Sequence, residues 1–140
     1  MDLPTNEANA ACYELLRKVA PDLWETFQGR LVPVAAGEGD PAERIRELMR
    51  LEQEVWTDFV EHDTEGRSRP LGRSFACCVD DLVGATGAAA IPAIASSGEP
   101  VARRREQLEA LLAVLRDERA PSLATLTANL EIQQAIHELD

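Results

Sequence analysis

Residues 40–62 read DPAERIRELMRLEQEVWTDFVEH, and this stretch decides the fold. Asp40 and Pro41 predict a helix start, because an aspartate can accept from the free amides of a first turn and proline is best tolerated there. Glu43 stands where its side chain can reach back to the cap. Apolar residues then recur at helical spacing: Ile45, Leu48, Met49, Leu51, Val55, Trp56, Phe59 and Val60. The stretch therefore predicts a long amphipathic helix.

Prolines mark the starts of other helices along the chain, because each is followed by a run with helical periodicity. We expect Gly29 to close a short second helix, a loop to follow through Pro33, Gly37 and Gly39, and Ile91-Pro92 to end or kink a later helix. That later helix begins at Pro70 or Ser74. The predicted helices span residues 6–19, 21–28, 41–62, 70–90, 100–118 and 122–139.

The length and pattern of the chain predict one all-α domain over residues 1–140. No segment alternates apolar and polar residues, so we expect no sheet. With 140 residues and 45% apolar composition, the chain is long enough for one hydrophobic core. The fold class is a single compact bundle of about five to six helices.

The net charge of −11 argues against nucleic acid and anionic membrane partners, because phosphate contacts need cations. Adjacent Cys77 and Cys78 do not suit a secreted disulfide framework. Residues 1–7 lack the pattern of a signal peptide, and the apolar stretch 82–97 is shorter than the roughly 20 residues of a membrane span. These features predict a cytoplasmic protein.

The negative charge is concentrated in residues 40–65, which hold nine carboxylates against three arginines. One interpretation is a solvated helix face with local ion pairs, such as Asp40 with Arg44. The alternative is an acidic surface that receives a basic protein partner.

Glu52 is the most unusual residue in this helix, because it lies at the centre of the apolar arc. A carboxylate there is costly to bury unless it is neutralised or paired. It is therefore a candidate ligand-binding residue, with Trp56 and Phe59 one and two turns later. The alternative is that Glu52 reaches water or meets an arginine such as Arg104, which we expect to pair with an acidic helix.

The run Asp80-Asp81-Leu82-Val83-Gly84-Ala85-Thr86-Gly87 is the second candidate. Glycines weaken a helix, so Gly84 and Gly87 indicate a close helix contact, a break, or a ligand near the backbone. With Asp80 they complete a speculative ligand site beside Glu52. No strand precedes the run, so it is neither a phosphate loop nor a dinucleotide fingerprint.

Arg67, Arg69 and Arg73 fall in a predicted flexible connection and form a candidate anion-binding site. A solvated linker is the alternative. His62 and His137 lie at predicted helix ends, where histidines usually cap carbonyls. Neither supplies a Glu-x-x-His pair, so we predict no metal and no cofactor.

The last predicted helix has two apolar faces. Leu123, Leu126 and Leu130 share one face, and Ile132, Ile136 and Leu139 share another. A second apolar face at the end of a small domain predicts a homodimer through this helix. We therefore expect a non-enzymatic interaction or regulatory module. The alternatives are a small-molecule-binding sensor bundle with a site near Glu52 and an enzyme using Glu52 or Asp80 as acid or base.

Overall fold

The computed structural model describes residues 7–120 and 122–139, all of them in helices or their connections. This confirms the all-α prediction for the described part of the chain. Residue 6, where the first predicted helix begins, and Pro121, which precedes the last one, lie outside it. The elements are α1 (Glu7–Val19), α2 (Pro21–Thr26), η1 (Phe27–Leu31), α3 (Val32–Ala36), α4 (Pro41–Glu61), α5 (Ser68–Ala95), α6 (Val101–Asp117) and α7 (Leu123–Glu138).

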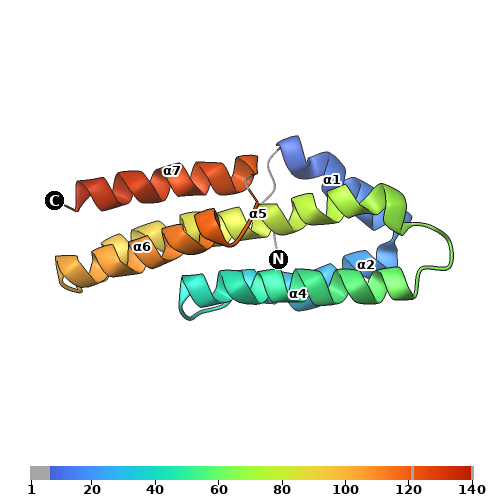
Figure 1. The fold of residues 1–140 in the computed structure, drawn as a ribbon, viewed down its shortest axis with the longest axis horizontal. Coiled ribbons are helices and arrows are strands. Elements are labelled where there is room, and N and C mark those ends of the chain that lie inside the picture. Colours follow the sequence, from blue (N-terminus) through green and yellow to red (C-terminus); the bar gives the residue numbers. More distant parts are fainter. Residues whose placement is uncertain (1–6, 121, 140) are drawn as a thin grey trace.

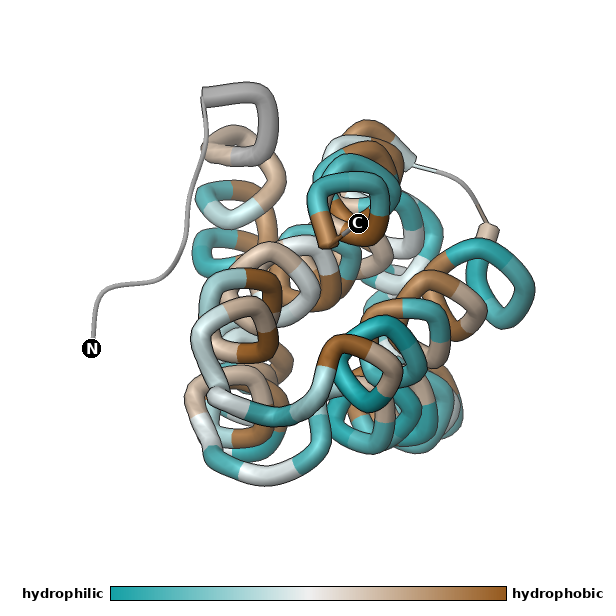
Figure 2. The backbone as a smooth tube through the Cα atoms, turned by 90° about the vertical axis from the view of Figure 1, so that its left-hand side faces the viewer, coloured by the Kyte–Doolittle hydropathy of each residue, from teal (hydrophilic) through white to brown (hydrophobic). Residues whose placement is uncertain are grey.

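The long helix α5 runs through the middle of the bundle (Figure 1). It contacts α1 and α4 along its first half and α6 and α7 along its second half. In Figure 1, α1 and α7 follow each other along one side of α5, and α4 and α6 lie on the other side. Figure 2, drawn along the long axis, shows hydrophobic and hydrophilic residues alternating around the helices. Helix α5 thus joins two ends of the molecule.

The prediction that Gly29 closes the second helix is wrong, because the chain stays helical from α2 through η1 and α3. The amide of Val32 donates to the carbonyl of Phe27, five residues back, which makes η1 a π-helical turn. Pro33 explains the wider turn, since its ring has no N–H and needs extra room in a helix. Burial of Phe27 and Leu31 holds the segment helical, so the loop begins only at Gly37.

Helix α5 also exceeds its predicted bounds. It begins at Ser68, where the Asp63 carboxylate accepts from the amides of Arg67 and Ser68. It continues past Pro92 to Ala95, so Pro92 does not end it. By length and composition α5 is apolar enough to cross a membrane. In the bundle, 56% of its apolar 18-residue stretch is buried.

The N-terminus of α4 forms as predicted, with the Asp40 carboxylate accepting from the amide of Glu43 at 3.1 Å. The predicted ion pair of Asp40 with Arg44 is wrong. Arg44 instead turns to α3 and donates to the carbonyl of Ala35 at 3.0 Å. The buried face of α4 follows the predicted spacing: Ala42, Ile45, Leu48, Leu51, Val55 and Phe59.

All six aromatic residues of the chain gather at one end of the bundle. Phe27 contacts the rings of Tyr13, Trp24 and Phe75, with centroids 5.7 to 6.3 Å apart. Trp56 stacks on Phe75 at 5.5 Å and continues the network to Phe59. We call this network the aromatic end. Large rings from α1, α2, η1, α4 and α5 fill its core.

Candidate functional site

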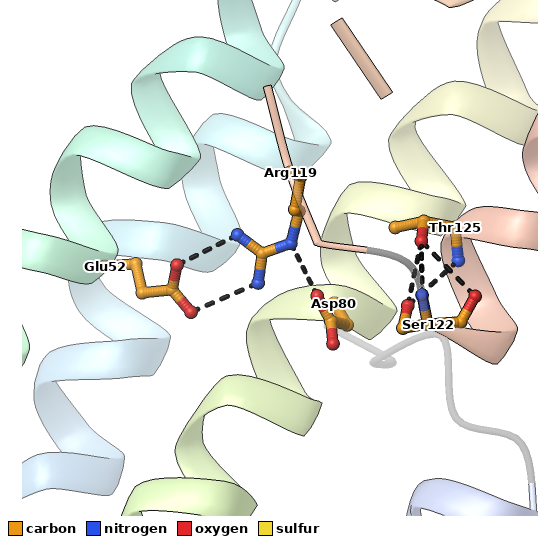
Figure 3. Close-up of polar contacts among 5 residues, drawn as sticks. All are labelled: Glu52, Asp80, Arg119, Ser122 and Thr125. Carbon is orange, nitrogen blue, oxygen red and sulfur yellow. Dashed lines mark hydrogen bonds and ion pairs between the residues drawn. The ribbon is translucent and has the colours of Figure 1, made fainter. Parts of the chain in front are cut away.

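Glu52 meets Arg119 where α4, α5 and the connection from α6 to α7 come together (Figure 3). The guanidinium donates two hydrogen bonds to the Glu52 carboxylate, at 2.9 and 3.1 Å. Its Nε donates to the Oδ1 atom of Asp80 at 2.5 Å. One arginine thus bonds two acids from different helices, and we call these three residues the Arg119 cluster.

The Arg119 cluster is partly shielded from water. The side chain of Arg119 is 9% exposed, and those of Glu52 and Asp80 are 23% and 21% exposed. Burial raises the pKa of Asp80 from its ordinary value, and it outweighs the opposing effect of the Arg119 charge. A side depression of about 430 Å³ borders the cluster.

Helix α7 begins with a cap three residues after Arg119. Ser122 and Thr125 form a reciprocal capping box, in which each side chain bonds the other residue's backbone amide (Figure 3). The guanidinium of Arg119 is held against α4 and α5 by its bonds to Glu52 and Asp80. The geometry is that of an ionic link between three elements, in which both carboxylates already bond the same guanidinium.

The alternative prediction that Glu52 pairs with an arginine is confirmed, but the arginine is Arg119 and not Arg104. Arg104 donates to the carbonyls of Ala95 and Glu99, at 2.9 and 2.8 Å. It therefore caps the end of α5, and its predicted pairing with an acidic helix is wrong. The wheel of α4 could show that Glu52 needs a partner, but it could not show which connection folds over it.

Of the other predicted ligand residues, only Asp80 joins Glu52. Trp56 and Phe59 belong to the aromatic end, where Trp56 stacks on Phe75. Gly84 and Gly87 face α7 and α6. A Cβ atom on Gly84 would lie 2.8 Å from the carbonyl oxygen of Ala124, so close helix packing accounts for this glycine. The space beside it is occupied by α7.

The three candidate anion-binding arginines do not share a loop. Arg67 pairs with Asp22 at 2.8 Å and lies over the Phe59 ring at 5.1 Å. Arg69 and Arg73 are exposed on the first turns of α5. The predicted flexible connection is thus wrong for both, because helix α5 begins at Ser68.

A buried pair links α1 to α5 and was not singled out from the sequence. The Tyr13 hydroxyl donates to Asp81 at 2.5 Å, and both residues are 6% exposed. Burial and the Asp81 carboxylate raise the pKa of Tyr13 well above its ordinary value. No sequence pattern pointed to this pair, and the buried face of α1 carries Tyr13 and Leu16, whereas Leu15 is 39% exposed.

The thiols and histidines have ordinary structural surroundings. Burial raises the pKa of Cys77 to about 12 and also raises that of Cys78, so neither is a ready thiolate. His62 ends α4, with its Nδ1 atom 2.9 Å from the carbonyl of Asp58, and this confirms its predicted capping position. Among residues 7–120 and 122–139, no three His, Cys, Asp or Glu side chains are grouped to hold a metal ion.

Helix α7 leaves one apolar face uncovered. The side chains of Leu123, Leu126 and Leu130 are 71%, 50% and 59% exposed, whereas Ala128 and Ile132 on the opposite face are buried. We call these three residues the leucine face. It is the most concentrated exposed apolar feature of the described chain, since Leu15, Val60 and Val101 are single residues on other helices.

The chain matches no protein-family model, no curated protein and no solved structure to which it was compared.

Proposed function

We propose that this chain is a non-enzymatic helical interaction module that self-associates through the leucine face of α7. The observation that carries the proposal is the exposure of Leu123, Leu126 and Leu130, each at least half exposed. Apolar side chains grouped in this way are typical of protein interaction sites. The opposite face of α7 is buried in its own bundle, so the leucine face is available to another molecule.

The spacing along α7 suits helix pairing. Leu123, Leu126 and Leu130 are followed at the same alternation of three and four residues by Gln133 and His137, both exposed. This is the spacing of a coiled-coil seam, in which side chains of one helix fit between those of the other. The apolar part lies near the start of the helix, and the polar part lies near its end.

A second copy of the chain suits this face for an electrostatic reason. Two chains of net charge −11 repel each other wherever their acidic surfaces meet. Residues 122–130, SLATLTANL, contain no charged side chain. A twofold arrangement that pairs this segment with its own copy therefore buries leucines and brings no like charges into contact.

The acidic residues support binding more than catalysis. Glu52 and Asp80 are both held by Arg119, and the thiols of Cys77 and Cys78 have raised pKa values. On α4, Arg50 pairs with Glu47 and Glu54, and Arg46 pairs with Glu43. A basic protein partner for residues 40–65 and a cytoplasmic location stay predictions.

The proposal is tested by sedimentation equilibrium of the whole chain from about 1 to 100 µM, where a dimer with a dissociation constant of about 10 µM or tighter is populated. We expect a dimer for the wild type and a monomer for the double variant Leu126→Glu and Leu130→Glu. Val60→Glu is the matched control, because it places the same charge at a 43% exposed apolar residue on α4.

Circular dichroism of both variants distinguishes lost association from lost folding, since all exchanged residues are exposed. A wild type that stays monomeric over the whole range contradicts the proposal. So does a dimer that survives the double variant but dissociates in Val60→Glu.

A further inference from the structure

A depression of about 470 Å³ lies between the end of α3, the start of α4, the second half of α5 and α6. Most of its lining consists of short apolar side chains, which leave space between neighbouring helices. These residues include Ala35, Ala36, Ala89, Ala90, Ala93 and Ile94. This depression shares no residue with the Arg119 cluster or with the leucine face. Its mainly apolar wall lies beside a cation.

The cation is Arg44, a half-buried residue on α4. Its Nη1 atom donates to the carbonyl of Ala35, but its Nε atom is buried and has no hydrogen-bond partner among the described residues. Arg44 also forms no ion pair with a described carboxylate, although Asp40 stands one turn earlier. In a chain of net charge −11, a half-buried arginine without an acid partner is unusual.

The lining also holds a second buried polar atom without a described hydrogen-bond partner. Gln107 of α6 lines the depression, and its buried Oε1 atom accepts no hydrogen bond from a described residue. Buried polar atoms normally find partners, so the side of the depression near Arg44 is suited to a charged or polar group.

We propose that this depression binds a small carboxylic acid with an apolar body, whose carboxylate pairs with Arg44. The carboxylate supplies the negative charge and the acceptor oxygens that the guanidinium lacks. The apolar body covers the alanine wall formed by α3 and α5. Gln107 offers an acceptor to any hydroxyl or amide N–H on the ligand. This assignment does not depend on self-association through α7.

The test uses sodium octanoate as the probe and octan-1-ol as its neutral match, with binding to the whole chain followed by isothermal titration calorimetry. We expect octanoate to bind below about 1 mM, and octan-1-ol to bind at least about tenfold more weakly because it has no charge for Arg44. Absence of octanoate binding in this range, or equal binding of the two probes, contradicts the proposal.

Variants then place the bound probe. Arg44→Gln should weaken octanoate binding at least about tenfold and leave octan-1-ol binding nearly unchanged, because the neutral probe has no charge to pair with Arg44. Ala93→Phe should weaken binding of both probes, since its ring would fill the depression. Ala93 is exposed, so this variant tests the site even if Arg44→Gln disturbs the bond to Ala35.

Ala110→Phe is the matched control, because Ala110 is exposed on α6 and does not line the depression. Leu126→Glu should also keep octanoate binding, which separates this site from the leucine face. Binding that survives both Arg44→Gln and Ala93→Phe but is lost in Leu126→Glu would show that octanoate lies on α7, and it would overturn the assignment.

Discussion

The two ends of α5 are packed by opposite means. Along its first half, Phe75 enters the aromatic end, where large rings from five elements fill the core. Along its second half, Gly84 and Gly87 bring the backbone against α7, and the core there is built from aliphatic and small side chains. We call this second region the small-residue end. The same helix is thus packed against large aromatic rings at one end and makes close backbone contacts with α7 at the other.

This difference determines how each end responds to change. A ring removed from the aromatic end leaves a cavity, and its cost follows the volume lost. A methyl group added at the small-residue end pushes against a neighbouring helix. The loss of folding free energy then depends on whether the contacted atom belongs to rigid backbone or to a flexible side chain. Both tryptophans lie at the aromatic end, so their fluorescence reports that end, whereas circular dichroism reports all helices.

The largest effect is expected for Phe27→Ala at the aromatic end. Phe27 is fully buried and contacts three other rings. Its removal should lower the free energy of unfolding by about 3 to 5 kcal/mol, the usual cost of deleting a buried phenyl ring. Urea titration followed by fluorescence and by circular dichroism measures the loss. A loss below about 1 kcal/mol would show that this end repacks freely and that ring volume does not hold it.

The start of α4 shows what could be predicted from sequence. Asp40 and Pro41 act on their own first turn, so the chemistry that places the helix start is local and readable. Gly29 and Pro33 also have strong local preferences, yet the chain remains helical through both. There the burial of Phe27 and Leu31, which depends on distant helices, outweighs the local preference.

The Arg119 cluster shows the same limit for the candidate site. A helical wheel indicates that Glu52 faces the core side and needs a partner. It contains no information on whether Arg104 or Arg119 arrives there, because that depends on how the α6 to α7 connection crosses α4. The wheel of α7 likewise showed two apolar faces, but only packing against α5 and α6 determines that the leucine face is the uncovered one.

A smaller effect is expected where the two ends meet, at Arg119. Arg119→Met leaves Glu52 and Asp80 without their shared cation. Breaking a buried pair costs about 3 to 5 kcal/mol, and the partial exposure of both carboxylates reduces this to about 2 kcal/mol. Thermal or urea unfolding measures it. Arg116→Met is the control, since Arg116 is 60% exposed and should change stability by less than about 0.5 kcal/mol.

The outcome at Arg119 also tests the role of the cluster. If Arg119 holds the connection through its ion pairs, adding Glu52→Gln to Arg119→Met should recover part of the lost stability, because one unpaired carboxylate is removed. Equal stability of Arg119→Met and wild type would instead mean that the three side chains meet without holding the connection in place.

The smallest effect is expected at the small-residue end, where Gly84→Ala and Gly87→Ala form a matched pair. Each adds one methyl group and gains about 1 kcal/mol of helix propensity. At Gly84 the new Cβ would lie 2.8 Å from the carbonyl oxygen of Ala124, a backbone atom that yields only if α7 moves. We expect the free energy of unfolding of Gly84→Ala to fall by about 1 kcal/mol, because the cost of overpacking exceeds the gain in helix propensity.

At Gly87 the nearest atom is the Cδ1 methyl of Leu115, at 3.2 Å, the end of a flexible side chain. The free energy of unfolding of Gly87→Ala should therefore stay within about 0.5 kcal/mol of the wild-type value. The comparison becomes sharper when two signals are followed. In Gly84→Ala, circular dichroism should begin to fall at lower urea than tryptophan fluorescence, since α7 loosens while the aromatic end stays packed. Coincident transitions in Gly84→Ala would mean that both ends unfold as one unit. Loosening the contact between α5 and α7 would then also destabilise the aromatic end.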